Sequence, residues 1–166
     1  MTPSEFESVF ADRKEITSID IEKNGVKWAM IDDVGRAVAR PGKAFISNTA
    51  TSDQDGIHWI TIRRYGPTAF IFDPLGPRNV RPNDKMMVDT LRAAGVNKIA
   101  WFPHAVQDKQ TTHCGWFALA VAKLINSQRP RTALGASRLV AQYFGPARSA
   151  SRENVAQLLR SGGYVP

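Results

Sequence analysis

An apolar run directly after the only cysteine limits the possible folds more than any other feature of the chain. Cys114 and Gly115 precede the run from Trp116 to Ile125, in which apolar residues recur at helical spacing. This pattern predicts a helix with Cys114 in its first turn. Unpaired N–H groups and the positive end of the helix dipole lie there, and both favour the thiolate, which is the nucleophilic form. The alternative is a buried structural cysteine, because free cysteines are commonly buried.

Two β-rich runs joined by a short turn predict an antiparallel hairpin in the middle of the chain. Ile57 to Ile62 and Thr68 to Phe72 consist largely of β-branched and aromatic residues. Tyr65-Gly66-Pro67 lies between them and carries residue types that turns favour. Asp73-Pro74 ends the second run sharply.

A second hairpin is predicted near the N-terminus. Ile16 to Glu22 alternates in polarity, and Asn24-Gly25 favours a two-residue turn before Val26 to Ile31. Further strands are expected at 44–50 and 98–102, and helices near 2–10 and at 84–94, 133–144 and 151–159, with a loop or short helix at 35–43. Strands lie between helices without a regular βαβ alternation. We therefore predict one α+β domain over residues 1–166, with a mostly antiparallel central sheet flanked by helices.

The charge balance of the chain is positive, with 22 Lys and Arg against 15 Asp and Glu and a net charge of +7. This balance permits contact with nucleic acid, an anionic membrane surface or an acidic protein. The basic residues are scattered, so a solvated basic surface is the alternative. A single cysteine excludes an internal disulfide and a multi-cysteine metal site, and we expect no metal. We also expect neither secretion nor a membrane span, since no signal pattern and no apolar stretch of ~20 residues occurs.

A cysteine nucleophile needs a histidine base, a group that orients this base, and donors for the oxyanion. His58 lies on the first strand of the central hairpin and Asp73 directly follows the second, so the two can meet at its open end. His113 is a poorer base because adjacent helical residues point in different directions. His104 has no obvious carboxylate partner nearby. The structural alternatives are a half-buried strand histidine for His58 and a turn-forming aspartate for Asp73.

Several motifs, taken in chain order, resemble the adenain family of viral maturation proteases. This family is related to the proteases of SUMO and other ubiquitin-like proteins. The matching segments are Asn48-Thr49-Ala50, Gly56-Ile57-His58-Trp59, Phe70-Ile71-Phe72-Asp73-Pro74-Leu75-Gly76, Gln107 and Cys114-Gly115-Trp116-Phe117. The resemblance covers roughly residues 44 to 125 and implies the adenain-like cysteine protease fold.

The resemblance also implies a catalytic role for each matched residue. Cys114 would be the nucleophile, His58 the general base and Asp73 the residue that orients His58. Gln107 would supply a side-chain donor to the oxyanion, beside the backbone N–H of Cys114. Gln110 is a rival for this role, but Gln107 fits the spacing of the family.

Gly56, Trp59 and Gly115 are expected to line the substrate cleft. The resemblance places Trp59 beside the site. Gly115 has no side chain, so we expect it to leave room for a substrate backbone close to the sulfur.

The chain departs from the adenain pattern in two respects. Asp73 stands where adenain has glutamate, so its strand must sit one methylene closer to the histidine. Adenain is activated by a viral peptide that can be disulfide-linked to a second cysteine, whereas this chain has only Cys114. A covalent tether of that kind is therefore excluded, and a non-covalent peptide activator stays open. Adenain also uses DNA as a cofactor, which the positive charge permits.

The resemblance predicts a monomeric viral endopeptidase that cleaves structural precursor proteins at small-residue, Gly-containing sites during virion maturation. It would act in the virion and the host cell interior, the nucleus included. One alternative is an isopeptidase that removes ubiquitin or SUMO by the same chemistry. Another is a non-catalytic, basic, DNA-binding domain associated with capsids.

Overall fold

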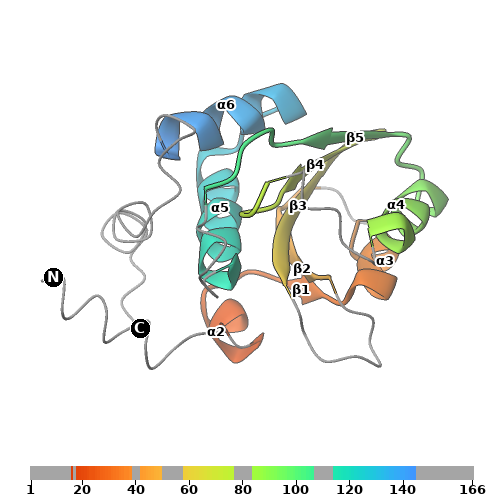
Figure 1. The fold of residues 1–166 in the computed structure, drawn as a ribbon, viewed down its shortest axis with the longest axis horizontal. Helices are drawn as coiled ribbons and strands as arrows, with labels where there is room; N and C mark the ends of the chain where they lie inside the picture. Colours follow the sequence, from red (N-terminus) through yellow and green to blue (C-terminus); the bar gives the residue numbers. More distant parts are fainter. Residues whose placement is uncertain are drawn as a thin grey trace, which may run out of the picture.

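The computed structural model describes residues 16, 18–38, 42–49, 58–76, 84–106 and 114–144. These residues form an α+β fold in which one mixed sheet lies between two groups of helices (Figure 1). The five strands lie side by side in chain order. They are β1 (Trp28–Ala29), β2 (Phe45–Asn48), β3 (Trp59–Tyr65), β4 (Thr68–Phe72) and β5 (Lys98–Trp101).

The sheet is mixed, so the prediction of a mostly antiparallel sheet is wrong. β3 pairs antiparallel with β2 and with β4, but β1–β2 and β4–β5 are parallel pairs. Each parallel pair is joined through helices. The 3₁₀ helix η1 (Ile31–Asp33) and α3 (Val34–Val38) follow β1, and α4 (Asp84–Ala93) follows β4. A helical crossover returns the chain to the end of the sheet where the previous strand began, which makes the next strand parallel.

The central hairpin of β3 and β4 forms as predicted. Tyr65 pairs with Thr68 across a turn in which Gly66 has a φ of +59°, a backbone conformation that glycine adopts easily. The guanidinium of Arg64 fastens the turn. Its Nε donates to the carbonyl of Gly66 at 2.7 Å and its Nη1 to the carbonyl of Ala94, after α4, at 2.8 Å. The pairing fixes the start of β3 beside the end of β4.

The N-terminal segment forms helix α2 (Ser18–Lys23), so the strand and hairpin predicted there are wrong. Gly25 has a φ of +74°, and its N–H donates to the carbonyl of Glu22 at 2.9 Å. The N–H of Val26 donates to the carbonyl of Ile21 at 3.3 Å. These two bonds close the C-terminus of a helix in the Schellman arrangement. Asn24-Gly25 therefore ends a helix instead of turning a hairpin.

Two further helices and α4 agree with the predictions from sequence. They are α5 (Cys114–Gln128) and α6 (Ala133–Phe144). The predicted helices near 2–10 and at 151–159 lie outside the described residues.

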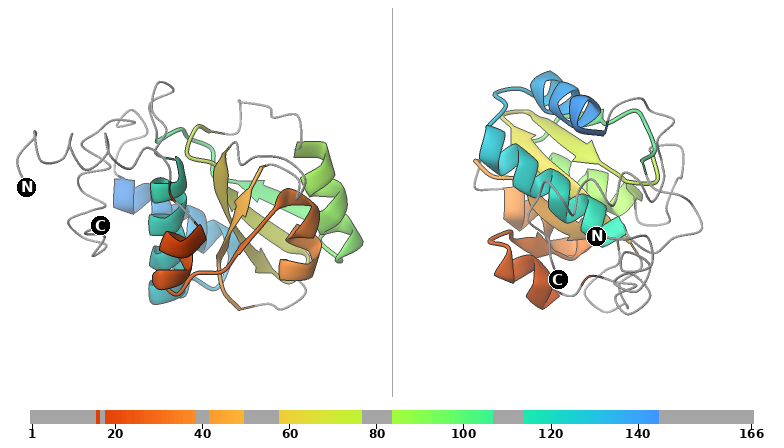
Figure 2. Two further views of the ribbon diagram at one scale, coloured as in Figure 1. Left: turned by 90° about the horizontal axis from the view of Figure 1, so that it is seen from below. Right: turned by 90° about the vertical axis from the view of Figure 1, so that its left-hand side faces the viewer.

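Each face of the sheet has its own apolar core. α2, α5 and α6 cover one face, where Phe70, Phe72 and Phe117 are buried. α3 and α4 cover the other, where Ile62 and Ile71 are buried. The views in Figure 2 show α5 on one side of the sheet and α4 on the other. The residues of α5 from Cys114 to Ala122 are all buried, which agrees with their unbroken apolar sequence.

Candidate active site

The structure brings His58 and Asp73 together at the open end of the central hairpin. Nε2 of His58 lies 2.7 Å from Oδ1 of Asp73, and the two residues are only 3% and 4% exposed. A carboxylate can only accept, so Nε2 carries the proton of this bond. The same Oδ1 accepts from the N–H of Leu75 at 2.9 Å. The carboxylate is thus held by the turn that follows β4, and it fixes the orientation of the imidazole ring.

Cys114 is the first residue of α5, within the predicted first turn, and its thiol lies close enough to His58 to raise the pKa of the ring. Because Nε2 is bound to Asp73, Nδ1 is the ring nitrogen left for the sulfur. Helix α5 is fastened to the hairpin by Thr61, whose buried hydroxyl donates to the carbonyl of Ala118 at 2.7 Å. Cys114, His58 and Asp73 therefore form one connected group, although they come from three separate parts of the chain.

The surroundings of His58 favour its protonated form. Burial is the largest single influence and lowers the pKa of His58. The hydrogen bonds to Asp73 and Cys114, together with the charges of both groups, outweigh this effect and raise the pKa of His58 from 6.5 to about 9. At neutral pH the ring is an imidazolium. This form stabilises a neighbouring thiolate and can donate a proton to a leaving group.

The space that Gly115 leaves open is filled by the protein itself. A Cβ added to Gly115 would lie 2.0 Å from Cγ2 of Ile16 and 3.0 Å from Cδ1 of Trp59. The expectation that this space takes a substrate backbone is therefore corrected. Trp59 packs beside the site as expected, and its ring meets Trp28 edge-on at a centroid distance of 6.1 Å. The role of Ile16 was missed from sequence because the residue was assigned to a strand.

We expect Gly115→Ala to lower the free energy of unfolding by about 1–2 kcal/mol. Overpacking of this kind costs roughly 1–3 kcal/mol, and the better helix propensity of alanine offsets up to about 1 kcal/mol of it. Urea denaturation measures the change. In the double variant Ile16→Ala/Gly115→Ala the two losses should be less than additive, since the clash is then absent.

Gly135→Ala in α6 is the matched control, because the atom nearest to the added Cβ, the hydroxyl oxygen of Thr132, would lie 3.2 Å away. If the Gly115→Ala protein is as stable as the Gly135→Ala protein, the close packing of Ile16 against α5 is contradicted.

Several predicted site residues lie outside the described residues. They are Gln107, Gln110, His113 and Gly56. The role of a glutamine as side-chain oxyanion donor therefore stays a prediction. The other expected donor, the N–H of Cys114, lies at the start of α5. His104 is exposed, and its ring packs edge-on against Phe102 at a centroid distance of 5.6 Å.

Within the described part of the chain, no group of three or more His, Cys, Asp or Glu residues is arranged to hold a metal ion. None of the described helices combines the length and the apolar character needed to cross a bilayer. Neither a known protein family nor a curated protein sequence matches the chain. The assignment of function therefore depends on the geometry of the site and on the motif resemblance.

Proposed function

We propose that the chain is a cysteine endopeptidase whose catalytic group is Cys114, His58 and Asp73. The observation that supports this most directly is the position of His58, which hydrogen-bonds to the buried carboxylate of Asp73 and lies close enough to the only cysteine of the chain for the two groups to interact. A nucleophile, a base and an orienting acid in this order are the parts that acyl transfer requires. A purely structural cysteine needs neither a buried imidazolium nor a carboxylate behind it.

The proposed reaction begins when the Cys114 thiolate attacks the scissile carbonyl carbon. The carbonyl oxygen becomes an oxyanion that accepts from the backbone N–H of Cys114 and from the amide of Gln107. The His58 imidazolium then donates its proton to the amine, the C–N bond breaks, and a thioester to Cys114 remains. His58 next takes a proton from water, and the hydroxide attacks the thioester carbonyl. The C–S bond breaks and the acid product leaves. The Cys114 thiolate and the His58 imidazolium are then restored. Asp73 keeps the ring oriented throughout.

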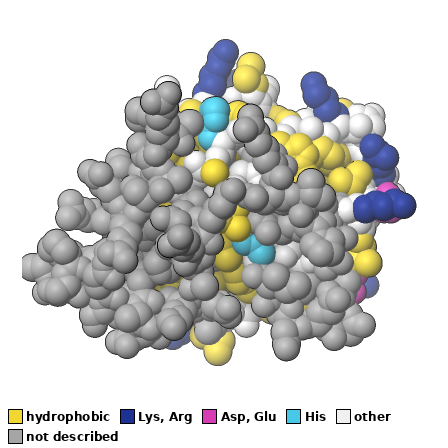
Figure 3. All heavy atoms as spheres, viewed as in Figure 1, with side chains coloured by type: hydrophobic (Ala, Val, Ile, Leu, Met, Phe, Trp, Pro, Cys, Tyr) yellow, Lys and Arg dark blue, Asp and Glu magenta, His cyan; other side chains and the backbone are white. Residues whose placement is uncertain are grey.

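The family resemblance supports small residues at the cleavage site. Ile16 and Trp59 fill the space beside Gly115, so the substrate would approach the sulfur from another side. We therefore propose Gly-containing sites in viral precursor proteins as substrates, cut during maturation inside the virion or the infected cell. DNA and a non-covalent peptide are proposed as activators from the family resemblance alone. On the face shown in Figure 3, the Lys and Arg side chains drawn in dark blue stand apart along the edges.

A substrate panel tests the proposal. Fluorogenic peptides with glycine on both sides of the scissile bond should be hydrolysed. Matched peptides with phenylalanine at the same positions should be cleaved at least about tenfold more slowly, which corresponds to 1.4 kcal/mol of lost transition-state binding. Ubiquitin and SUMO carrying a C-terminal fluorophore belong in the same experiment. Rapid turnover of these two substrates, with no cleavage of the free peptides, would replace the endopeptidase by an isopeptidase. The absence of any turnover would contradict both.

A further inference from the structure

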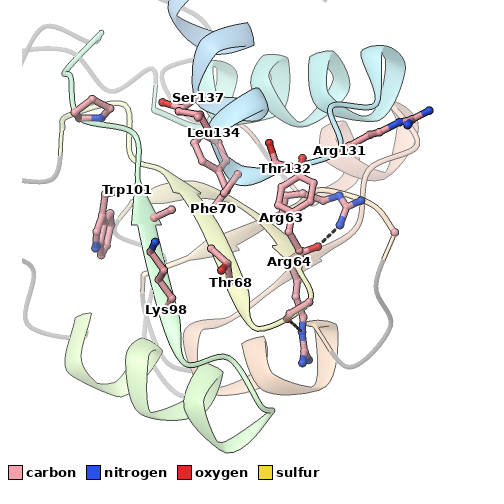
Figure 4. A pocket seen from close by; sticks show the side chains of 16 residues that line it. Arg63, Arg64, Thr68, Phe70, Lys98, Trp101, Arg131, Thr132, Leu134 and Ser137 are labelled. Carbon is pink, nitrogen blue, oxygen red and sulfur yellow. Dashed lines mark hydrogen bonds between the residues drawn. The ribbon is translucent and has the colours of Figure 1, made fainter.

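A second site lies at the turn end of the β3–β4 hairpin, away from His58 and Asp73. It is a hollow of about 990 Å³ between the sheet and the first turns of α6 (Figure 4). The lining residues Arg63 and Phe70 lie along the hairpin from His58 and Asp73, so the hollow begins roughly 10–17 Å from that pair. The proposed reaction makes no use of this site.

The pairing register places two rows of side chains on the floor of the hollow. Alternate residues of a strand point to the same face of a sheet, so directly paired residues on neighbouring strands line up. One row is Arg63, Phe70 and Ala100, and the other is Tyr65, Thr68 and Lys98. α6 closes one side with Ala133, Leu134 and Ser137.

The charged side chains at the hollow are all basic. Arg63 and Lys98 come from the floor, and the exposed Arg131 stands at the rim. Arg64 also borders the hollow, but its guanidinium turns away to bind the carbonyls of Val38 and Ala94. Arg63 lies with Cζ 4.2 Å from the centre of the Tyr65 ring. No described Asp or Glu lines the hollow. The site is therefore electropositive, and part of its charge is held in place.

The interior of the hollow is apolar. Phe70 is fully buried below it, and Ala100 and Ala133 add aliphatic surface. Leu134 is 60% exposed, which makes it one of three large hydrophobic side chains that stand exposed in the described part of the chain. The hollow therefore combines apolar surface with basic side chains from both its floor and its rim, and protein interfaces also combine apolar contact with arginine.

We propose that this hollow docks an acidic peptide segment that carries an aliphatic or aromatic side chain. The acidic groups would pair with Lys98, Arg131 and Arg63, and the apolar side chain would pack against Leu134. The chemistry is separate from that of Cys114, so this proposal does not depend on the proposed protease activity.

A nucleic acid fits the hollow less well. Sequence-independent binding of single strands uses exposed aromatic rings on which bases stack. Here the guanidinium of Arg63 covers one face of the Tyr65 ring, and Phe70 is buried. The ring of Trp101, which also borders the hollow, packs against the core on the other face of the sheet. A phosphate backbone also gains nothing from contact with Leu134. The limited aromatic surface and the exposed Leu134 therefore favour a peptide.

Fluorescence anisotropy with full-length Cys114→Ala protein tests the proposal, because this variant cannot consume the probe by thiol chemistry. The probe is a short fluorescein-labelled peptide rich in glutamate, with one central Leu-Phe pair. We expect Lys98→Gln and Arg131→Gln each to weaken binding about 3-fold, and the double variant about 10-fold. Leu134→Ser should weaken binding about 10-fold through lost apolar contact. Higher salt should weaken binding further.

Lys85→Gln is the matched control, since Lys85 is also exposed but lies on α4, on the other side of the sheet. This variant should bind the peptide as the parent protein does. Any one of three results would overturn the proposal. The first is that the peptide does not bind at low salt. The second is that the Lys98, Arg131 and Leu134 variants bind it as tightly as the parent protein, and the third is that a lysine-rich peptide with the same Leu-Phe pair binds equally well. Tighter binding of single-stranded DNA, lost in the same variants, would assign the hollow to nucleic acid instead.

Discussion

The Cys114→Ala protein should hydrolyse the glycine-containing peptides at least about 10⁴-fold more slowly than the wild type, with its fold intact. Loss of the nucleophile removes the covalent route, and the residual rate comes from binding and oxyanion stabilisation alone. Urea denaturation should give nearly unchanged stability, because alanine removes only one small group from the first turn of α5.

Thiol labelling supplies an independent measurement of the same site. Since Cys114 is the only cysteine, one carboxamidomethyl group per chain is expected with iodoacetamide at neutral pH. His58→Ala should slow this alkylation, because the imidazolium no longer stabilises the thiolate. Two results would show that Cys114 is only a structural residue. One is that the Cys114→Ala protein turns over substrate at the wild-type rate, and the other is that His58→Ala leaves the rate of alkylation unchanged.

Asp73→Asn should lower turnover by about 10²–10⁴-fold while leaving peptide affinity nearly unchanged. The amide has the shape of the carboxylate but no charge, so it neither stabilises the imidazolium nor selects the same ring tautomer. The pH profile separates this effect from simple misfolding. In the wild type, kcat/KM should fall at high pH as His58 loses its proton, with a limb near the pKa of about 9. In the variant this limb should move towards lower pH.

The stability of the protein should follow the same titration. The pKa of His58 is raised by folding, so its contribution is fully present below pH 6.5 and is lost as the pH rises through about 9. A difference of this size corresponds to roughly 3 kcal/mol. Urea denaturation between pH 6 and pH 10 should therefore show a falling free energy of unfolding in the wild type and a smaller fall in Asp73→Asn. Identical pH profiles for the two proteins would contradict the buried His58–Asp73 pair.

Local signals in the sequence predicted the parts of the fold that place the candidate site. The turn residues around Gly66 and the β-branched runs beside them predicted the β3–β4 hairpin, and hairpin pairing then brings His58 near Asp73. The apolar run after Cys114 predicted α5 and its first residue. These predictions hold because they depend on neighbours close in sequence.

The wrong predictions depended on distant contacts instead. Ile19 and Ile21 alternate with polar neighbours as in a strand, but Ile21 packs into the core from a helix and Ile19 is 61% exposed. Six residues are too few for periodicity to distinguish the two. The parallel pairing of β5 follows from the path of α4 across the sheet. The contact of Ile16 with Gly115 joins residues far apart in the chain, and no local pattern predicts it.

The turn at Gly66, with the hydrogen bonds that Arg64 makes there, lies at the end of the hairpin opposite to the His58–Asp73 pair. Extra residues inserted in that turn would lengthen the loop without changing the register that sets the spacing of the imidazole and the carboxylate. The residues at the turn end can therefore change during evolution without moving His58 or Asp73. The same hairpin thus allows the binding partners of the protein to change while its proposed catalytic residues stay in place.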